Sequence, residues 1–339
     1  MFKGCSKLSS INCLATDITA TSALSSWTNG VASTGTFCKV KGVEWPTGTS
    51  GIPTNWTTCE MEDTNTLALV FQTDGTLMIA KVSSSADFKP NISMSVNSTS
   101  DWQTFGGTRS FDTFYNFTKG TVLYFKGNNP DGLNKSNTDY IQFATTGTVA
   151  AFGSVMSLID DGAGITTTIP NERCFAELFR NTTIIRAPKL PATTLTRYCY
   201  LNMFRSCTSL TVAPHLPAKT LAPNCYQSMF NGCTQLAGVS LPATTLAPAC
   251  YNQTFSGCTS LTNIILPATS LVDSCYNQMF LNCSKLSTII CNATDISTSS
   301  ALNNWTDGVA SSGTFRKAAG VEWPTGTSGI PSSWKVVEF

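Results

Sequence analysis

Charged residues are scarce in this chain. Asp, Glu, Lys and Arg make up 12% of the 339 residues, about half of the usual share near 25%. The formal net charge is +1, so the composition excludes a strongly basic protein that binds nucleic acid. No apolar run reaches the roughly 18 residues that span a bilayer, and we expect no membrane span in this chain.

The residues that enzymes and metal sites need are also rare or badly spaced. Histidine occurs once, at His215, and an imidazole without a nearby acid is a poor catalytic base. The glycines lack phosphate-loop spacing, and Asp160-Asp161 lacks the pattern of a calcium loop. Cysteine is frequent, with 14 residues, but no closely spaced cysteine pair stands near histidine ligands as in zinc sites. We predict that the chain is not an enzyme and holds no cofactor and no metal.

What the sequence does contain is a repeat of 25 or 26 residues. Leu-Pro-Ala begins at Leu190, Leu216, Leu241 and Leu266, a Cys-Tyr pair begins at Cys199, Cys225, Cys250 and Cys275, and a second cysteine follows at Cys207, Cys233, Cys258 and Cys283. A fixed period in the twenties indicates a solenoid, in which each rung buries its apolar face against its neighbours. The repeat places this solenoid at residues 161–290, with about five rungs.

Each rung is predicted to contain a strand followed by a short helix. In the strand of residues 258–266, Leu261, Ile264 and Leu266 should point inward. In the predicted helix of residues 222–233, the cysteines and Met229 lie four apart and would share one buried face. Because eight helical residues rise about 12 Å, the two cysteines of one rung are too far apart for a disulfide. We therefore interpret the cysteines as small apolar core residues, and bridges between adjacent rungs stay open.

The two ends of the chain are copies of one segment. Residues 1–56 and 279–334 align without a gap, so that Trp27 matches Trp305 and Trp45 matches Trp323. Solenoids need caps that close their apolar ends, and we predict caps at 1–58 and 291–339. The offset of 278 residues between the matched tryptophans suggests that the native protein is a tandem array of such modules. Tandem or head-to-tail self-association is accordingly one expected kind of contact.

Residues 59–160 have the pattern of a separate β-rich domain. Residues 66–72 and 76–82 alternate like strands on either side of Asp74-Gly75, which is a hairpin signal. Further strands are predicted at 92–96, 122–126, 140–144 and 148–156. Short strands divided by Gly, Asn, Asp and Pro predict a β-sandwich. The predicted fold class is therefore α+β, with a leucine-rich-repeat solenoid that has short helices, a β-sandwich and Gly/Trp-rich caps.

Two sets of residues are candidates for binding. The tyrosine column consists of Tyr200, Tyr226, Tyr251 and Tyr276, and the outward strand positions are Ser240, Ile265 and Ile290. Stacked tyrosines can hold a sugar ring or a partner loop, but they can equally pack between helices, and both interpretations stay open. Exposed isoleucines on a strand face favour a protein partner.

The rung resembles the BspA-type leucine-rich repeats of bacterial surface proteins. Residues 255–267 match the family's aromatic-x-x-Cys-x-x-Leu turn and its Leu-x-x-Ile-x-Leu-Pro strand, and the resemblance covers 170–290. It implies an extracellular or cell-surface protein that binds a protein or glycan on a host or bacterial surface, and it brings no catalytic residue. Two alternatives stay open: a phage or prophage receptor-binding fibre component, and a glycan-binding module.

Overall fold

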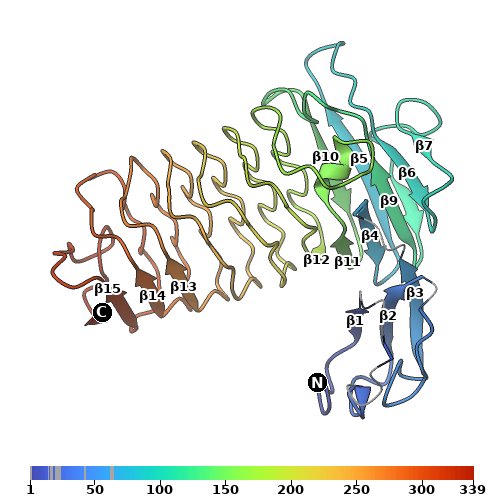
Figure 1. The fold of residues 1–339 in the computed structure, drawn as a ribbon, viewed down its shortest axis with the longest axis horizontal. Coiled ribbons are helices and arrows are strands. Elements are labelled where there is room, and N and C mark those ends of the chain that lie inside the picture. Colours follow the sequence, from blue (N-terminus) through green and yellow to red (C-terminus); the bar gives the residue numbers. More distant parts are fainter. Residues whose placement is uncertain (1, 14, 16–17, 20–23, 42, 62–64) are drawn as a thin grey trace.

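An elongated solenoid continues at one end into a β-rich region, and the amino-terminal segment lies beside that region (Figure 1). The computed structural model describes all residues except 1, 14, 16–17, 20–23, 42 and 62–64. Parts of the predicted cap at 1–58 and the first residues of the predicted β-domain therefore lie outside the described residues.

The two ends of the chain have the same fold. At the amino end, β1 (Ser10–Cys13), β2 (Gly35–Val40) and β3 (Trp56–Met61) form a parallel sheet. At the carboxyl end, β13 (Asn263–Leu266), β14 (Thr288–Cys291), β15 (Thr314–Lys317) and β16 (Lys335–Glu338) form another. The tryptophans also match, since Trp27 stacks on Trp45 at 5.6 Å and Trp305 stacks on Trp323 at 5.8 Å.

The β-rich region contains two sheets with a common core. The first has the order β10-β5-β8, and the second has the order β12-β11-β4-β9-β6-β7. Their bounds are β4 Leu67–Phe71, β5 Gly75–Val82, β6 Ser93–Val96, β7 Gln103–Thr104, β8 Tyr115–Phe117, β9 Val122–Lys126, β10 Tyr140–Thr145, β11 Val149–Phe152 and β12 Ile184–Arg186. The predicted strand at 148–156 ends early, and a 3-10 helix, η2 (Val155–Leu158), follows it.

The predicted β-sandwich is not supported as a separate domain. Strand β12 belongs to the range predicted as solenoid, yet it pairs in parallel with β11. The buried residues of both regions form one continuous core, from Leu67 in β4 to Trp334 at the carboxyl end. The β-rich region therefore continues the stacking direction of the rungs.

The predicted hairpin at Asp74-Gly75 is wrong. Strand β4 pairs with β9 and β11, whereas β5 pairs with β8 and β10. The connecting residues cross from one sheet to the other and are held by long-range contacts. The Asp74 carboxylate accepts the Lys119 amide at 2.7 Å, and the Thr73 hydroxyl accepts the Thr148 amide at 2.8 Å.

The short helices predicted in the rungs are also wrong. Within the described residues the structure contains no α-helix, and the segments predicted as helical are runs of turns. In residues 222–233 every fourth residue is left-handed: φ is 56° at Asn224, 52° at Ser228 and 75° at Gly232. A left-handed residue in each turn is incompatible with a right-handed α-helix.

The amides of this run divide between the turn and the next rung. The Met229 amide donates to the carbonyl of Tyr226, three residues earlier, at 3.1 Å. The Phe230 amide instead donates to the carbonyl of Thr254 on the next rung, at 3.0 Å. The same alternation continues along the run. Each turn segment therefore needs its neighbour to satisfy half of its amides, whereas a helix would satisfy them internally.

Two columns of stacked rings run through the interior. One column comprises Phe179, Phe204, Phe230, Phe255 and Phe280, with centroids 5.6–6.0 Å apart. At its first end Phe179 meets Phe143 of β10, and at its last end Phe280 meets Trp305. Offset-stacked rings at this spacing stabilise beyond their burial. The ring column thus joins the β-rich region, the rungs and the carboxyl-terminal segment.

The second cysteine of each rung has a structural role. The thiols of Cys207, Cys233, Cys258 and Cys283 donate to the carbonyls of Phe179, Phe204, Phe230 and Phe255 at 2.9–3.1 Å. In the first rung Thr182 occupies this position, and its hydroxyl donates to the Phe179 carbonyl of its own rung, three residues earlier, at 2.8 Å. These cysteines are free and buried, as are the first cysteines of the rungs. The prediction that they are core residues agrees with this burial.

We expect Cys258→Val to destabilise the solenoid and Cys258→Thr to be tolerated better. Valine removes the donor, so the buried Phe230 carbonyl keeps the Cys233 amide at 2.9 Å but loses its thiol partner, which costs about 0.5–1.5 kcal/mol. Threonine restores a donor, as Thr182 does in the first rung. Urea unfolding of both variants would measure this difference. Equal losses for valine and threonine would contradict a hydrogen-bonding role.

Candidate functional site

The tyrosine column is part of the interior. Tyr226 lies between Tyr200 at 5.9 Å and Tyr251 at 5.7 Å, and Tyr251 lies 6.1 Å from Tyr276. All four side chains are at most 2% exposed, and burial raises the pKa of each hydroxyl well above 10. The interpretation of this column as a surface for a sugar ring is contradicted, because rings of adjacent rungs cover the faces that a ligand would need.

The strand face of the solenoid carries the exposed candidates. In β13, Ile264 and Leu266 are buried and Ile265 is 56% exposed, because successive strand side chains point to opposite sides. The parallel register aligns Ile265 with Ile290, Arg316 and Val337. In the earlier rungs the corresponding position directly precedes Leu190, Leu216 or Leu241. We call the residues at this position the outer row: Lys189, His215, Ser240, Ile265, Ile290, Arg316 and Val337.

The outer row is open to solvent along the solenoid. Lys189, His215, Ser240 and Ile265 are exposed, and Ile290 is half-buried. The rungs at 210–216 and 236–241 do not form regular strands, since Pro214 lacks an amide donor and Gly238 lacks a side chain to pack. Alternation in the sequence predicts Ser240, Ile265 and Ile290 as outward residues, but it does not predict Lys189 and His215. The sequence feature that could have identified both residues is their position directly before the inward leucine of the rung.

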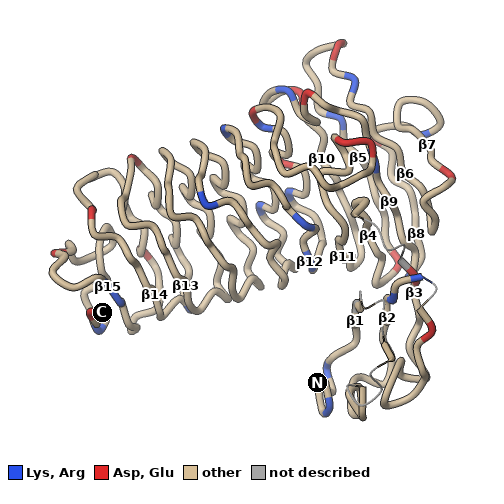
Figure 2. Tube along the Cα trace, viewed as in Figure 1, with Lys and Arg blue, Asp and Glu red and all other residues tan. Residues whose placement is uncertain are grey.

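Charge is unevenly distributed along this face. Residues 220–272 contain no Asp, Glu, Lys, Arg or His. The basic side chains of the solenoid gather in the rungs next to β12, and its middle is free of charge (Figure 2). One end of the strand face is therefore basic and the middle is neutral.

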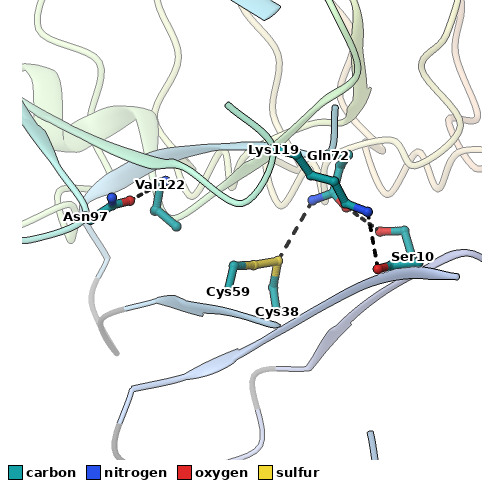
Figure 3. Close-up of a disulfide and its surroundings, with 8 residues drawn as sticks. Ser10, Cys38, Cys59, Gln72, Asn97, Lys119 and Val122 are labelled. Atoms are coloured by element: carbon teal, nitrogen blue, oxygen red, sulfur yellow. Dashed lines mark hydrogen bonds between the residues drawn. A yellow bond between two sulfur atoms is a disulfide. The ribbon is translucent and has the colours of Figure 1, made fainter. Parts of the chain in front are cut away.

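In the amino-terminal copy the same row is an interface. Cys38 and Cys59 stand where the carboxyl-terminal copy has Arg316 and Val337, and they form a disulfide with Cα atoms 4.5 Å apart (Figure 3). Both cysteines are buried in a cluster with residues of the second sheet: Ala68, Val70, Val122, Tyr124, Ala150 and Phe152. At the edge of this contact the Ser10 hydroxyl donates to the Gln72 side chain at 2.8 Å. The sequence analysis did not anticipate this disulfide.

A hollow lies where the strand face meets the β-rich region. It has a volume of about 380 Å³ and is lined by the end of β11, by Arg186 of β12 and by the chain around Leu190 and His215. The Arg186 guanidinium lies 5.1 Å from the centre of the Phe152 ring. Arg186, Lys189 and His215 all line the hollow, and the described part of its lining contains no acidic residue. This arrangement suits an anionic group.

Asp160, which the sequence offered as a possible calcium ligand, has a structural role. The Asp160 carboxylate accepts the amides of Gly164, Ile165 and Thr166 at 2.8–3.2 Å and so shapes its own loop. Among the described residues, no three His, Cys, Asp or Glu side chains gather as a metal site would require. In the same part of the chain, no helix has the length and apolar character for crossing a membrane.

Residues 201–306 match a family described as BspA type leucine-rich repeat region, in six copies. The repeat region is of the BspA type. Neither the curated proteins nor the solved structures contain a match to the chain. The matched residues include the later turn runs, the ring columns after Phe179 and Tyr200, and the outer row from His215 to Ile290.

We expect the stability of the BspA-type region to fall at alkaline pH. Burial raises the pKa of the Cys207 and Cys275 thiols to about 11 and of the Cys174 and Cys283 thiols to about 12. In the unfolded chain a thiol ionises near 8.5, so the unfolded state releases protons first. The contribution of these thiols is complete below about pH 8.5 and is lost as the pH rises toward 11 or 12. Over this range each thiol lowers the free energy of unfolding by up to about 1.4 kcal/mol per pH unit.

Urea midpoints measured between about pH 8 and pH 11 would test this expectation. Cys207→Thr provides the matched variant, because Thr182 occupies the same position in the first rung and does not ionise. The variant should show a shallower decline. A midpoint that stays constant over this range would contradict the burial of the thiols.

Proposed function

We propose that this chain is a non-catalytic binding protein that acts outside the cell or on its surface. The outer row would bind a protein on a host or microbial surface. The observation that supports this proposal is that the equivalent row of the amino-terminal copy forms an interface. There it is buried against a sheet, whereas along the solenoid it is uncovered and includes Ile265 and Ile290.

The chemistry of the row favours a protein partner over a glycan. Ile265 is 56% exposed and lies directly beside Ile290 in the parallel register of β13 and β14. Contiguous exposed apolar residues are typical of protein interaction sites. A sugar would need an aromatic platform, and the stacked tyrosines are unavailable because they are buried. The aliphatic row and the absence of charge at 220–272 therefore support a protein surface.

The cysteines support both the location and the absence of catalysis. Disulfides persist in oxidising environments, and the Cys38–Cys59 bond is typical of proteins outside the cytoplasm. The thiols of the rungs are buried, and burial raises the pKa of Cys174 and Cys283 to about 12. Nucleophilic cysteines require the opposite, an accessible thiol with a lowered pKa. Surface display of BspA-type repeats supports the same location.

Self-association is a second candidate, because the amino-terminal copy of the row docks on a sheet of the same chain. The carboxyl-terminal copy cannot repeat that contact unchanged. Arg316 stands in place of Cys38, and its charge would enter a cluster with Val70 and Tyr124. Burying an unpaired charge is costly. Head-to-tail contacts would therefore need another surface on the second copy, and sedimentation of the purified chain would detect them.

We expect Ile265→Asp combined with Ile290→Asp to abolish binding. The assay would measure the affinity of the chain for a panel of extracellular-matrix proteins and for epithelial cells. Each isoleucine would contribute about 1.5–3 kcal/mol when buried, so the double variant should bind at least about 100-fold more weakly. Ile165→Asp is the matched control, since Ile165 is 66% exposed and belongs to the loop held by Asp160, not to the outer row.

Both variants should unfold at the temperature of the unmodified chain, because the substituted side chains point outward. If the double variant binds as tightly as the control to a partner that the unmodified chain recognises, the outer row is not the binding surface. Binding to a glycan array with no protein partner would favour the glycan-binding alternative.

A further inference from the structure

The hollow beside β12 has two kinds of lining. Its floor is apolar and includes Ala151, Phe152, Pro188 and Pro214. Basic side chains from successive rungs stand around it, at Arg186, Lys189 and His215. The hollow is at the basic end of the strand face, and it borders the docked amino-terminal segment through Phe152.

Among the described residues, no acidic side chain pairs with Arg186. Its side chain is half-buried and packs over the Phe152 ring, and it forms no ion pair with any described acidic residue. Burial lowers the pKa of the Arg186 guanidinium, as expected for a cation that has lost part of its hydration. A guanidinium in this position would gain from an incoming carboxylate, because a charge-assisted hydrogen bond in a partly dry site is strong.

The other two basic residues of the lining lie where they could contact the same anion. Lys189 is exposed, and its ammonium donates to the Asn65 side chain at 3.1 Å, which holds it beside the β-rich region. His215 is exposed at the equivalent position on the next rung. An anion bound at Arg186 would therefore meet positive or hydrogen-bonding groups from two neighbouring rungs.

We propose that this hollow binds an acidic peptide segment, with its carboxylate at Arg186 and a neighbouring apolar side chain on the Ala151, Pro188 and Pro214 floor. This inference rests on the proposed function, because it assigns the chemistry of the partner at one end of the outer row. The lining favours a peptide over an acidic sugar. Sugars need several neutral hydrogen-bonding side chains, and the described residues of the lining include no Asn, Gln, Ser, Thr, Asp or Glu.

Fluorescence polarisation with labelled model peptides tests this assignment on the full chain. The probe is Glu-Leu-Glu-Leu-Glu with an amidated carboxyl terminus, and its match without carboxylates is Gln-Leu-Gln-Leu-Gln, amidated in the same way. We expect the acidic peptide to bind at least about tenfold more tightly than its match, because the charge-assisted bond is lost with the carboxylates. Equal affinity of the two peptides, or no binding of the acidic one, would overturn the proposal.

Substitutions locate the binding. Arg186→Gln should weaken acidic-peptide binding at least about tenfold, and Arg186→Lys should lose less, because it keeps the charge without the fork of donors. Arg205→Gln is the matched control, since Arg205 is also half-buried but does not line the hollow. His215→Gln changes an exposed side chain and provides a second variant if Arg186→Gln fails to fold. Unchanged affinity in the folded variants would overturn the proposal.

Two further arms separate the possible outcomes. An oligosaccharide of glucuronic acid should not displace the peptide. If the sugar binds in an Arg186-dependent way and the peptide does not bind, the hollow is a site for an acidic glycan and the peptide proposal is wrong. The Ile265→Asp and Ile290→Asp double variant should keep acidic-peptide binding, because neither residue lines the hollow. If that variant loses the protein partner and the unmodified chain does not bind the acidic peptide, the peptide site is refuted and the outer row remains the partner-binding surface.

Discussion

Each rung of this molecule is completed by the rung beside it. In the turn run at 222–233, alternate amides bond within the turn and the others bond to carbonyls of the next rung. The rings at Tyr226 and Phe230 stack on their counterparts above and below. A single rung would leave half of these amides unpaired and both faces of each ring uncovered. This dependence explains why the inward residues repeat so strictly and why the core continues into the β-rich region.

The sequence predicted the repeat and its core but not the backbone of the rungs. Cys225, Met229 and Cys233 are all buried, as a helical interpretation expected. A turn run with one left-handed residue in every four also places residues four apart on one side, so the two backbones give the same pattern. Glycine fills only two of the left-handed positions in these turn runs, at Gly232 and Gly257, whereas most are filled by residues such as Ser228 and Gln253, so composition does not reveal the turns. The hairpin failed because contacts distant in sequence, at Lys119 and Thr148, decide where β4 and β5 pair.

The candidate site was predicted only where alternation along a strand was clear. Ile265 is outward as its neighbours Ile264 and Leu266 required. Lys189 and His215 occupy the same row, but prolines beside them hid the alternation. The Cys38–Cys59 disulfide and the Arg186–Phe152 contact depend on the docking of segments far apart in the chain. No local pattern encodes such contacts.

Stacking fixes the interior and leaves the outer row free to vary. The two end copies keep Phe37 and Phe315 in the core but differ at Cys38 and Arg316, in the outer row. The most direct test of this account is a surface-displayed library that varies one position at a time in the outer row and at the adjacent inward leucines, scored for resistance to protease. The account predicts that outer-row positions from Lys189 to Ile290 accept most residues other than proline, whereas Leu190, Leu216 and Leu266 accept few. An outer row as restricted as the inward positions would contradict it.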